Sequence, residues 1–369
     1  MRYHRQKNPS QSRLMKFTQS ERILKRTFMN KLMQLCMGLL AFYAGPLFSQ
    51  DIHFSQYYHA PQHINPALTG INPGDISFTG NFRSQWKSAL QKQYTTGFVS
   101  ADKKFYLQRK DNQLFGGGLM IYYDGAGDGN LNLAQLGLSG SYAYAFDREN
   151  VLSLGLQATI SQRAFSLADL TFDNQYIDGQ FDPDALPNEQ FQDQRKYCPS
   201  FGAGLNFHGK QHNKRTRMDI GGAVFNLNRP NQSFRDDVKS PLPMRFTVYM
   251  MPTIQLASIL DISLAGSAQF QGPYVEALGG GGLRIHISQR RAREMSLQLG
   301  CAYRFNSFGD AIIPGIEFQY AGFLAGFTYD INISKFQAAT NRNAGPELAV
   351  RYLITHVKTL DEFRICRLF

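Results

Sequence analysis

Long apolar runs are missing from almost all of this sequence. Outside residues 32–48, no stretch of the 369 residues approaches the roughly 18 consecutive apolar side chains that a membrane-spanning helix needs. Helical periodicity is equally scarce after residue 50. The mature chain therefore lacks a helical span, and an exported protein of this kind is periplasmic, secreted or an outer-membrane barrel.

Cysteine is sparse as well. Cys198, Cys301 and Cys366 follow the leader, an odd number that provides no disulfide framework and no metal-site spacing. No nucleophile elbow is present. A barrel lipase needs a Ser/His pair on its outer face, but the nearest strand candidates, Ser296 and His286, both have inward parity. We expect no enzymatic activity and no cofactor.

Excess positive charge is confined to the N-terminus. The net charge is +11, but residues 1–50 hold nine Lys/Arg and one acid, Glu21, which leaves 30 basic and 27 acidic residues in the rest. A nucleic-acid-binding surface needs a clustered basic excess. The body of the chain has none, so a nucleic-acid partner is not expected.

The first 50 residues have the pattern of an over-long start followed by a signal peptide. Arg22, Lys25, Arg26 and Lys31 precede the apolar run 32–48, and a plausible cleavage point lies near residues 49–50. A membrane anchor is the alternative, although the run is short for a span. The leader predicts export from the cytoplasm.

Alternation with a period of two dominates residues 312–332. Bulky side chains occupy every second position over 312–320 and again over 323–332, and Ala321-Gly322 separates the two runs. Such alternation indicates strands with unlike faces, and a two-residue break indicates a tight hairpin.

The same pattern recurs along the chain and predicts an all-β transmembrane barrel of about 14 antiparallel strands over residues 75–355. Residues 51–74 form an irregular lumenal or periplasmic lead-in, and residues 356–369 a periplasmic tail. The expected strands are Ile76–Trp86, Tyr94–Phe105, Phe115–Tyr123, Leu131–Phe146, Leu152–Arg163, Ser200–Phe207, Met218–Leu227, Leu242–Met250, Leu260–Phe270, Tyr274–Ile287, Met295–Arg304, Ile312–Tyr320, Phe323–Asn332 and Pro346–Ile354.

Parity then assigns side chains to lipid or lumen. A lipid-facing row is expected at Leu136, Leu138, Tyr142, Tyr144 and Phe146, with Gln135, Ser139 and Ser141 inward. One set of charged and polar residues shares inward parity: Arg83, Arg284, Arg304, Glu317, Asp330, Asn332, Glu347 and Arg351. These residues either coat a solvated channel or hold the N-terminal segment or a cargo tail.

Closure makes a further prediction. A barrel has no free edge in lipid, so the first and last strands must pair and bring Arg83 close to Glu347. The acidic stretch Ser166–Tyr197 is expected to form a long outer loop that contacts partners.

The lead-in is expected to be ordered because aromatic residues cluster in it. Phe54, Tyr57 and Tyr58 need a surface, and the glycine-rich wall near Gly279–Gly282 offers close approach. Phe115–Leu119 is a second glycine-rich strand of this kind.

Two groupings carry weak signals for metal. Asp124–Asn130 faintly resembles a calcium loop but lacks its closing glutamate. His53, His59 and His63 have no spacing that suits a metal site. Structural roles are the better interpretation of both.

Several ordered motifs together resemble the PorP/SprF outer-membrane proteins of the type IX secretion system. They are Phe54-Ser55-Gln56-Tyr57, Asn65-Pro66-Ala67 with Gly70, Phe225–Phe234, Asp310–Pro314 and Tyr329–Ser334. The final Cys366-Arg367-Leu368-Phe369 departs from the family's Cys-Pro-Arg-Phe ending.

The resemblance implies an outer-membrane barrel that supports secretion and surface attachment of large adhesins, with gliding in some members. It implies contacts with the C-terminal domains of secreted adhesins, with periplasmic and lipoprotein components of the machinery and with outer-membrane lipid. Docking is expected at Phe54, Gln56, Tyr57, Asn65, Pro66, Ala67 and Gly70. A general diffusion porin is the alternative function.

Overall fold

A computed structural model provides the structure of this chain. It describes residues 53–85, 93–107, 112–126, 131–166, 175–177, 180–182, 194–235, 239–290, 293–306, 311–334 and 342–355. The signal peptide, its cleavage site and the C-terminal tail lie outside these ranges.

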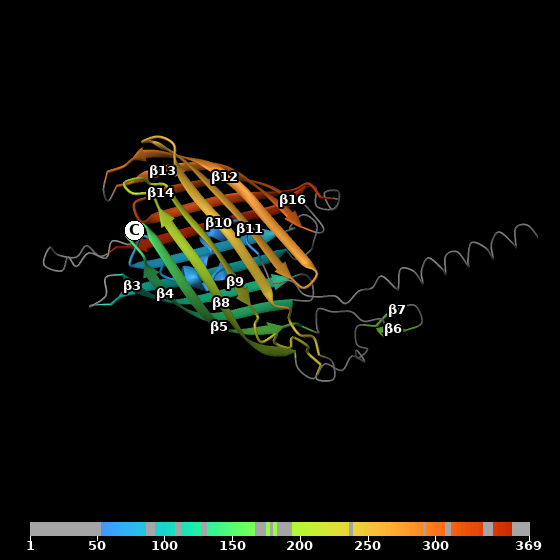
Figure 1. Ribbon diagram of the computed structural model, residues 1–369. Helices are drawn as coiled ribbons and strands as arrows, with labels where there is room; N and C mark the ends of the chain where they lie inside the picture. Colours follow the sequence, from blue (N-terminus) through green and yellow to red (C-terminus); the bar gives the residue numbers. More distant parts are fainter. Residues whose placement is uncertain are drawn as a thin grey trace, which may run out of the picture. The chain divides into compact units, whose positions relative to one another are not determined.

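Fourteen antiparallel strands close into one barrel (Figure 1). Each strand pairs with its neighbour in sequence, and β1 pairs with β16 to seal the sheet. The strands are β1 (Ile76–Gln85), β2 (Tyr94–Tyr106), β3 (Gln113–Ala126), β4 (Leu131–Ala145), β5 (Asn150–Ala164), β8 (Arg195–Lys210), β9 (Arg217–Phe225), β10 (Arg245–Gln255), β11 (Leu260–Gln271), β12 (Tyr274–Ser288), β13 (Met295–Asn306), β14 (Ala311–Tyr320), β15 (Phe323–Asn332) and β16 (Asn343–Ile354).

The predicted closure is confirmed. Arg83 is the register partner of Glu347, and the Arg83 Nε lies 3.7 Å from the Glu347 Oε2. The predicted hairpin at Ala321-Gly322 is also confirmed, with Tyr320 paired to Phe323.

The largest departures from the predicted boundaries are at β10 and at the start of β8. The strand expected at Leu242–Met250 is displaced to Arg245–Gln255. It continues because Pro252 interrupts only the ladder to β11, which resumes at Thr253. The expected loop Ser166–Tyr197 ends sooner, since β8 already begins at Arg195. Most of that loop lies outside the described ranges, apart from the two-residue strands β6 (Tyr176–Ile177) and β7 (Gln180–Phe181).

The outer face of the barrel is apolar, as parity predicted. Leu138 is 58% exposed and stands in sequence between the buried residues Gly137 and Ser139. The other predicted lipid-facing residues, Leu136, Tyr142, Tyr144 and Phe146, are exposed too. In an aqueous protein this row would be unfavourable, whereas in lipid it is the contact surface.

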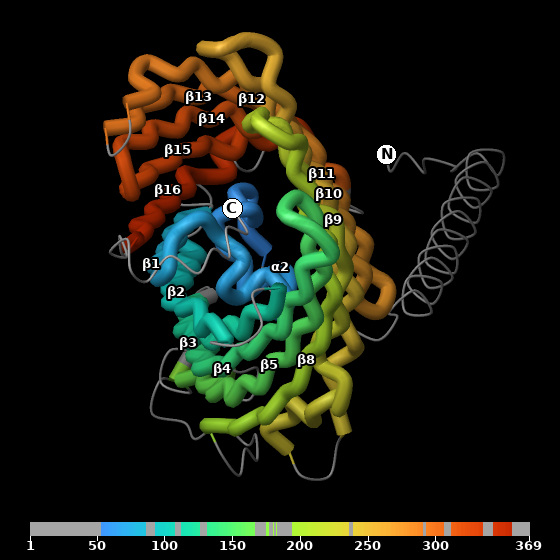
Figure 2. The backbone as a smooth tube through the Cα atoms, turned by 60° about the vertical axis from the view of Figure 1, so that its left-hand side comes forward, coloured from blue at the N-terminus to red at the C-terminus, as the bar shows by residue number. Residues whose placement is uncertain are grey.

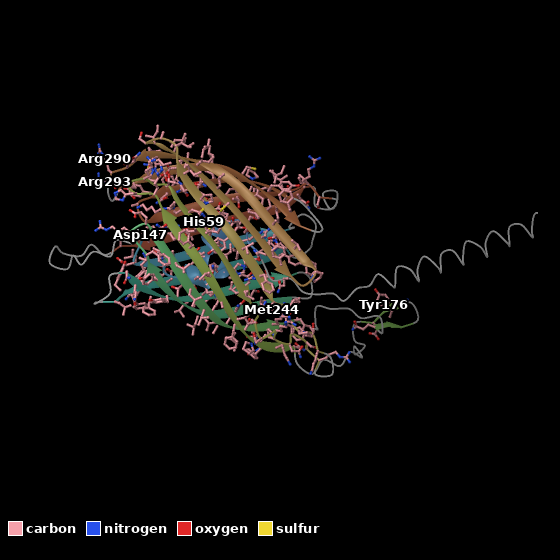
Figure 3. All side chains as sticks on the ribbon, viewed as in Figure 1. His59, Asp147, Tyr176, Met244, Arg290 and Arg293 are labelled. Carbon is pink, nitrogen blue, oxygen red and sulfur yellow. The ribbon has the colours of Figure 1, made fainter. Side chains whose placement is uncertain are left out.

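Short turns gather at one end of the barrel. In Figure 3, Asp147 in the β4–β5 turn and Arg290 and Arg293 in the β12–β13 turn lie at one end, while Met244 and Tyr176 lie at the other. Outer-membrane barrels have short turns on the periplasmic side and longer loops outside. We call these the short-turn end and the long-loop end.

A lumenal segment, residues 53–75, occupies the inside of the barrel, and we call it the plug. Figure 2 shows it within the ring of strands, around the label α2. It contains the 3-10 helices η1 (Tyr57–His59) and η2 (Pro66–Leu68) and the short helix α2 (Pro61–Ile64). Among the described residues, no helix is both long and apolar enough to cross a membrane.

The buried apolar side chains pack between plug and wall. One cluster joins Tyr57, Ile64 and Leu68 to wall residues that include Leu278 and Ile313. A second cluster joins Phe54 and Ala60 to Phe98, Met120 and Tyr122. The plug therefore supplies one side of both of these clusters.

The register predicts a depth-dependent cost of charge on the outer face. Leu138→Arg, in the middle of β4, should destabilise the folded barrel by about 2–4 kcal/mol, but Phe146→Arg, one residue beyond the strand, by about 0–1 kcal/mol. Urea titration of each variant in lipid vesicles measures the difference. Equal losses would place Leu138 away from the bilayer midplane.

Candidate functional site: the plug and the lumenal charge cluster

Local sequence sets the shape of the plug. The Asn65 side chain accepts a hydrogen bond of 2.8 Å from the backbone N–H of Ala67, and Pro66 occupies the first position of η2. Pro61 starts α2 in the same way. Proline has its φ preset and lacks the N–H that a first turn leaves unpaired, so both turns form at low cost.

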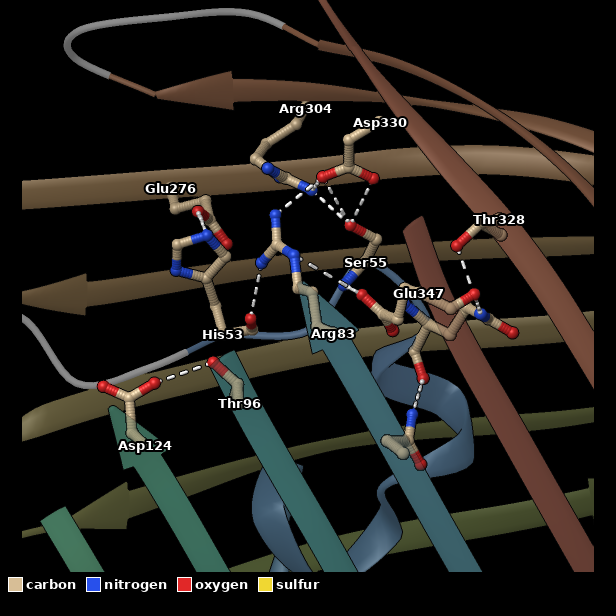
Figure 4. Close-up of polar contacts among 12 residues, drawn as sticks. His53, Ser55, Arg83, Thr96, Asp124, Glu276, Arg304, Thr328, Asp330 and Glu347 are labelled. Carbon is tan, nitrogen blue, oxygen red and sulfur yellow. Dashed lines mark hydrogen bonds and ion pairs between the residues drawn. The ribbon is translucent and has the colours of Figure 1, made fainter. Parts of the chain in front are cut away.

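The lumenal charge cluster, formed by Arg83, Arg304, Asp330 and Glu347, holds the start of the plug (Figure 4). Asp330 accepts from the Arg83 guanidinium at 2.6 Å and from the Arg304 guanidinium at 2.5 Å. The hydroxyl of Ser55, in the plug, donates to the same carboxylate at 2.9 Å. Arg304 also donates to the Ser55 hydroxyl, so β13 and β15 both hold this plug residue, and Arg83 on β1 is joined to it through Asp330.

Glu347, on β16, binds the backbone of the plug. Its two carboxylate oxygens accept the N–H groups of Ser55 and Gln56, each at 2.8 Å. The Gln56 side chain donates to the Thr328 hydroxyl and to the Glu347 carbonyl, each at 3.1 Å. Charge-assisted bonds of this kind are short and directional, so they fix both position and register.

Opposite charges compensate within the cluster. Two guanidiniums face two carboxylates, and all four side chains are almost completely buried. Removing such charges from water costs several kcal/mol each, which only close pairing and further hydrogen bonds offset. The plug provides several of those bonds, and among them the His53 carbonyl accepts from the Arg83 guanidinium at 2.7 Å.

Three titratable plug residues near the cluster have pKa values shifted in favour of their neutral forms. Burial, reinforced by the charges of Arg83 and Arg304, keeps the pKa of His53 well below its usual value, although its Nε2 lies 3.2 Å from Glu276. Burial also raises the pKa of Tyr57 and of Tyr58. These three residues therefore favour contributing hydrogen-bonding groups over charge.

Polar contacts continue along the rest of the plug. The Asn65 amide donates to the Leu205 carbonyl at 2.9 Å and to the Tyr249 hydroxyl at 3.0 Å. The Ser141 hydroxyl donates to the Thr69 carbonyl at 2.6 Å. The Gly70 N–H donates to Asp102 at 3.0 Å. These bonds anchor the plug to strands on several sides of the barrel.

Glycines in the wall make room for the plug. A Cβ at Gly204 would lie 2.0 Å from the Asn65 side chain, and one at Gly155 would lie 2.2 Å from the Ala67 nitrogen. A Cβ at Gly116 would lie 2.2 Å from the Thr69 carbonyl oxygen. Close backbone approach is thus possible only because these positions lack side chains.

The expectation that Gly279–Gly282 forms the docking wall was wrong. A Cβ at Gly279 would meet nothing within 4 Å, and those at the next three glycines would first meet barrel residues. The other glycine-rich strand, Phe115–Leu119, does meet the plug, at Gly116 and at Gly118 beside Gln62.

The structure places the predicted lumen residues at three levels. Arg83, Arg304, Asp330 and Glu347 form the charge cluster. Arg284, Glu317 and Arg351 line one cavity beside the plug, where Arg284 and His59 lie 3.8 and 3.4 Å from Glu317. Asn332 accepts the backbone N–H of Ser334 at 2.9 Å.

The predicted docking residues of the lead-in lie in the plug. Phe54, Gln56, Tyr57, Asn65, Pro66 and Ala67 are buried, and Gly70 has a φ of +72° that favours glycine. Sequence analysis missed Ser55, Thr328 and Asp102 as plug contacts. Ser55 stands within the first motif, and the other two have inward parity, but only the fold shows which wall residues the plug meets.

The three histidines of the lead-in lie apart from one another in their contacts, and residues 127–130 of the calcium-like stretch Asp124–Asn130 lie outside the described residues. The rings of His63 and Tyr122 stack at 5.8 Å, while His53 and His59 contact different glutamates. In the described ranges, no group of three or more His, Cys, Asp or Glu could hold a metal ion. Ser296 pairs in register with His286, whose Nε2 instead lies 2.7 Å from Asp261.

Comparison with protein families identifies the family of this chain. The model for the type IX secretion system membrane protein PorP/SprF matches residues 47–352. The chain belongs to the PorP/SprF family. As a PorP/SprF protein with this fold it is an outer-membrane barrel, and family membership implies partnership with components of the secretion machinery. A search among curated proteins gave no match.

Solved outer-membrane barrels resemble this PorP/SprF chain only distantly. The CymD monoaromatic hydrocarbon channel shares 10% identity with a TM-score of 0.47, covering 81% of this chain and 93% of its own. A Pseudomonas aeruginosa FadL homologue shares 12% with a TM-score of 0.44, covering 78% and 92%. BamA from Haemophilus ducreyi shares 13% with a TM-score of 0.42, covering 76% and 70%.

Loss of one buried carboxylate should free the plug. Asp330→Ala leaves the guanidiniums of Arg83 and Arg304 without their closest partner, which costs about 3–5 kcal/mol. Chymotrypsin, which cleaves after Phe54, Tyr57 and Tyr58, should then cut the plug while the barrel stays folded. Thr328→Val, which removes one neutral bond, should remain resistant.

A methyl group added at a glycine that meets the plug should also loosen the plug. Gly155→Ala places a carbon against Ala67, so it should lower the chymotrypsin resistance of the plug or the unfolding midpoint of the protein. Gly279→Ala is the matched control, because its methyl group meets open space. Equal behaviour of both variants would contradict the plug position.

Proposed function

We propose that this protein is a non-enzymatic, plugged barrel that supports the secretion and cell-surface attachment of large adhesins. Its partners are the C-terminal domains of secreted adhesins and periplasmic or lipoprotein components of the type IX machinery. In this proposal, the barrel is the membrane-embedded platform and the plug is the element that couples the lumen to those partners. Gliding is then a consequence in cells whose adhesins move.

The charge cluster between plug and wall is the observation that carries this proposal. A diffusion channel needs a polar, open lumen, whereas here Ser55 and Gln56 bind four wall residues, Arg304, Thr328, Asp330 and Glu347, in a buried network. Fixing a plug with charges from β1, β13, β15 and β16 couples its position to the arrangement of those strands. A partner that shifts the plug would therefore change the wall, and the reverse also holds.

A general diffusion porin is the second candidate. The cavity of about 520 Å³ beside the plug favours it, since that space reaches the short-turn end. Against it, the apolar clusters around Phe54 and Tyr57 fill lumen that a porin would keep wet. We therefore rank the general diffusion porin below the plugged platform as a candidate function.

The double variant Phe54→Ser/Tyr57→Ser tests the proposal. It removes both aromatic anchors of the plug but no residue of the charge cluster or of the lipid face. We expect the barrel to reach the outer membrane in normal amounts, while surface display of adhesin falls at least tenfold. Flow cytometry of displayed adhesin and gel mobility of the unheated barrel measure the two effects.

A matched control is Ile71→Ser, near the end of the plug and outside these two aromatic clusters. It should leave display close to normal. Normal display by the double variant, with its plug shown to be cleavable by chymotrypsin, would mean that the plug has no part in adhesin attachment.

A further inference from the structure

The β12–β13 turn carries two exposed arginines at the short-turn end of the barrel. Arg290 and Arg293 both lie at this end in Figure 3, and both are exposed. Among the described residues, neither side chain makes a hydrogen bond or an ion pair. Two guanidiniums that no protein group neutralises can bind an anion from outside the chain.

Hydrogen bonds hold this turn in one shape. The Gln289 side chain donates to a carbonyl of the neighbouring β10–β11 turn. The backbone N–H of Arg293 donates to the Arg290 carbonyl at 2.9 Å, and the N–H of Ala321, in the β14–β15 turn, donates to the Glu294 carbonyl at 2.7 Å. An ordered turn presents its side chains to a ligand with less loss of entropy than a flexible one.

The acidic side chains of this rim are occupied or belong to the lumen. Glu294 borders the cavity of about 520 Å³ beside the plug, and neither Arg290 nor Arg293 borders it. Asp261, on β11, is buried, and it accepts from the Arg215 guanidinium at 2.8 Å. Neither carboxylate forms an ion pair with the two exposed arginines.

The apolar outer face of the barrel continues up to this turn. Ile285 and Ile287 extend the outward row of β12 and are 47% and 57% exposed. Leu256 directly follows β10, extends the outward row of that strand from Ile254, and is 57% exposed. The surface next to the turn is therefore the one that lipid covers, so the nearest external anion is a lipid headgroup.

Aromatic side chains mark the level of the headgroups. Tyr320 and Phe323 flank the next turn along the rim, and Phe323 is the register partner of Tyr352. All three point outward and are exposed. Such tyrosines concentrate where the bilayer meets water. Met295, the first residue of β13, pairs with Tyr320, so the two arginines just before it lie at the headgroup level.

We propose that the β12–β13 turn binds the headgroup of an anionic phospholipid in the periplasmic leaflet. Arg290 and Arg293 donate to its phosphate oxygens, and its acyl chains lie along Ile285 and Ile287. A zwitterionic headgroup would bring an ammonium group that both guanidiniums repel, so the site favours lipids with a net negative charge. This inference does not depend on the adhesin proposal or on the plug.

Retention of two lipids with identical acyl chains tests the site. Protein purified in detergent is mixed with equal amounts of phosphatidylglycerol and phosphatidylcholine, and native mass spectrometry counts the lipids that stay bound. The protein should retain phosphatidylglycerol in preference to phosphatidylcholine by about fivefold or more. The double variant Arg290→Gln/Arg293→Gln should lose this preference, and gel mobility of the unheated barrel checks that it still folds.

Arg148→Gln is the matched control. Arg148 is an exposed arginine at the same end of the barrel, but it stands between Asp147 and Glu149 in the β4–β5 turn. This variant should keep the preference of the unmodified protein. Equal retention of both lipids by the unmodified protein, an unchanged preference in the double variant, or an equal loss in Arg148→Gln would overturn the proposal.

A photoreactive side chain distinguishes lipid from a protein partner at the same place. A benzophenone group introduced at residue 287 and irradiated in outer membranes should label phospholipid that is enriched in the anionic class. Adding Arg290→Gln/Arg293→Gln should remove that enrichment. Labelling of a protein in place of lipid would show that the rim is a protein interface and would contradict the lipid assignment.

Discussion

The interaction on which the structure depends is the burial of Asp330 between Arg83 and Arg304, with Ser55 as its fourth member. Charges in the lumen of a barrel are ordinarily hydrated, and burial of these four side chains beneath the plug requires them to pair. Because the plug supplies hydrogen bonds that complete this pairing, plug and wall stabilise each other. Neither the ordered plug nor the buried charge cluster is expected to persist without the other.

The rest of the architecture follows from the need to fit a chain inside a closed sheet. Glycines at 116, 155 and 204 bring the plug backbone within contact of the strands, and neutral donors such as Asn65 satisfy the wall where no charge is present. The outer face needs only apolar side chains, because lipid tails do not require any particular apolar side chain at a given position. Sequence constraints are therefore concentrated inside the barrel.

The period-two alternation in the sequence was sufficient to predict that the strands exist, roughly how many there are, and which of their side chains face lipid or lumen. A period of two places Asp330 and Glu347 inward whatever their contacts are, and closure alone brings Arg83 to Glu347. The plug could not be traced in the same way, because residues 53–75 have no period and their partners lie up to 292 positions away. The glycine runs at 116–118 and 279–282 look alike in sequence, and only packing distinguishes them.

The central claim is that the plug fills the lumen in the membrane, and single-channel conductance in planar bilayers tests it most directly. The intact protein should show no steady open channel, whereas deletion of residues 53–72 should give a stable conductance. A steady, porin-like conductance from the intact protein, unchanged by the deletion, would contradict the account.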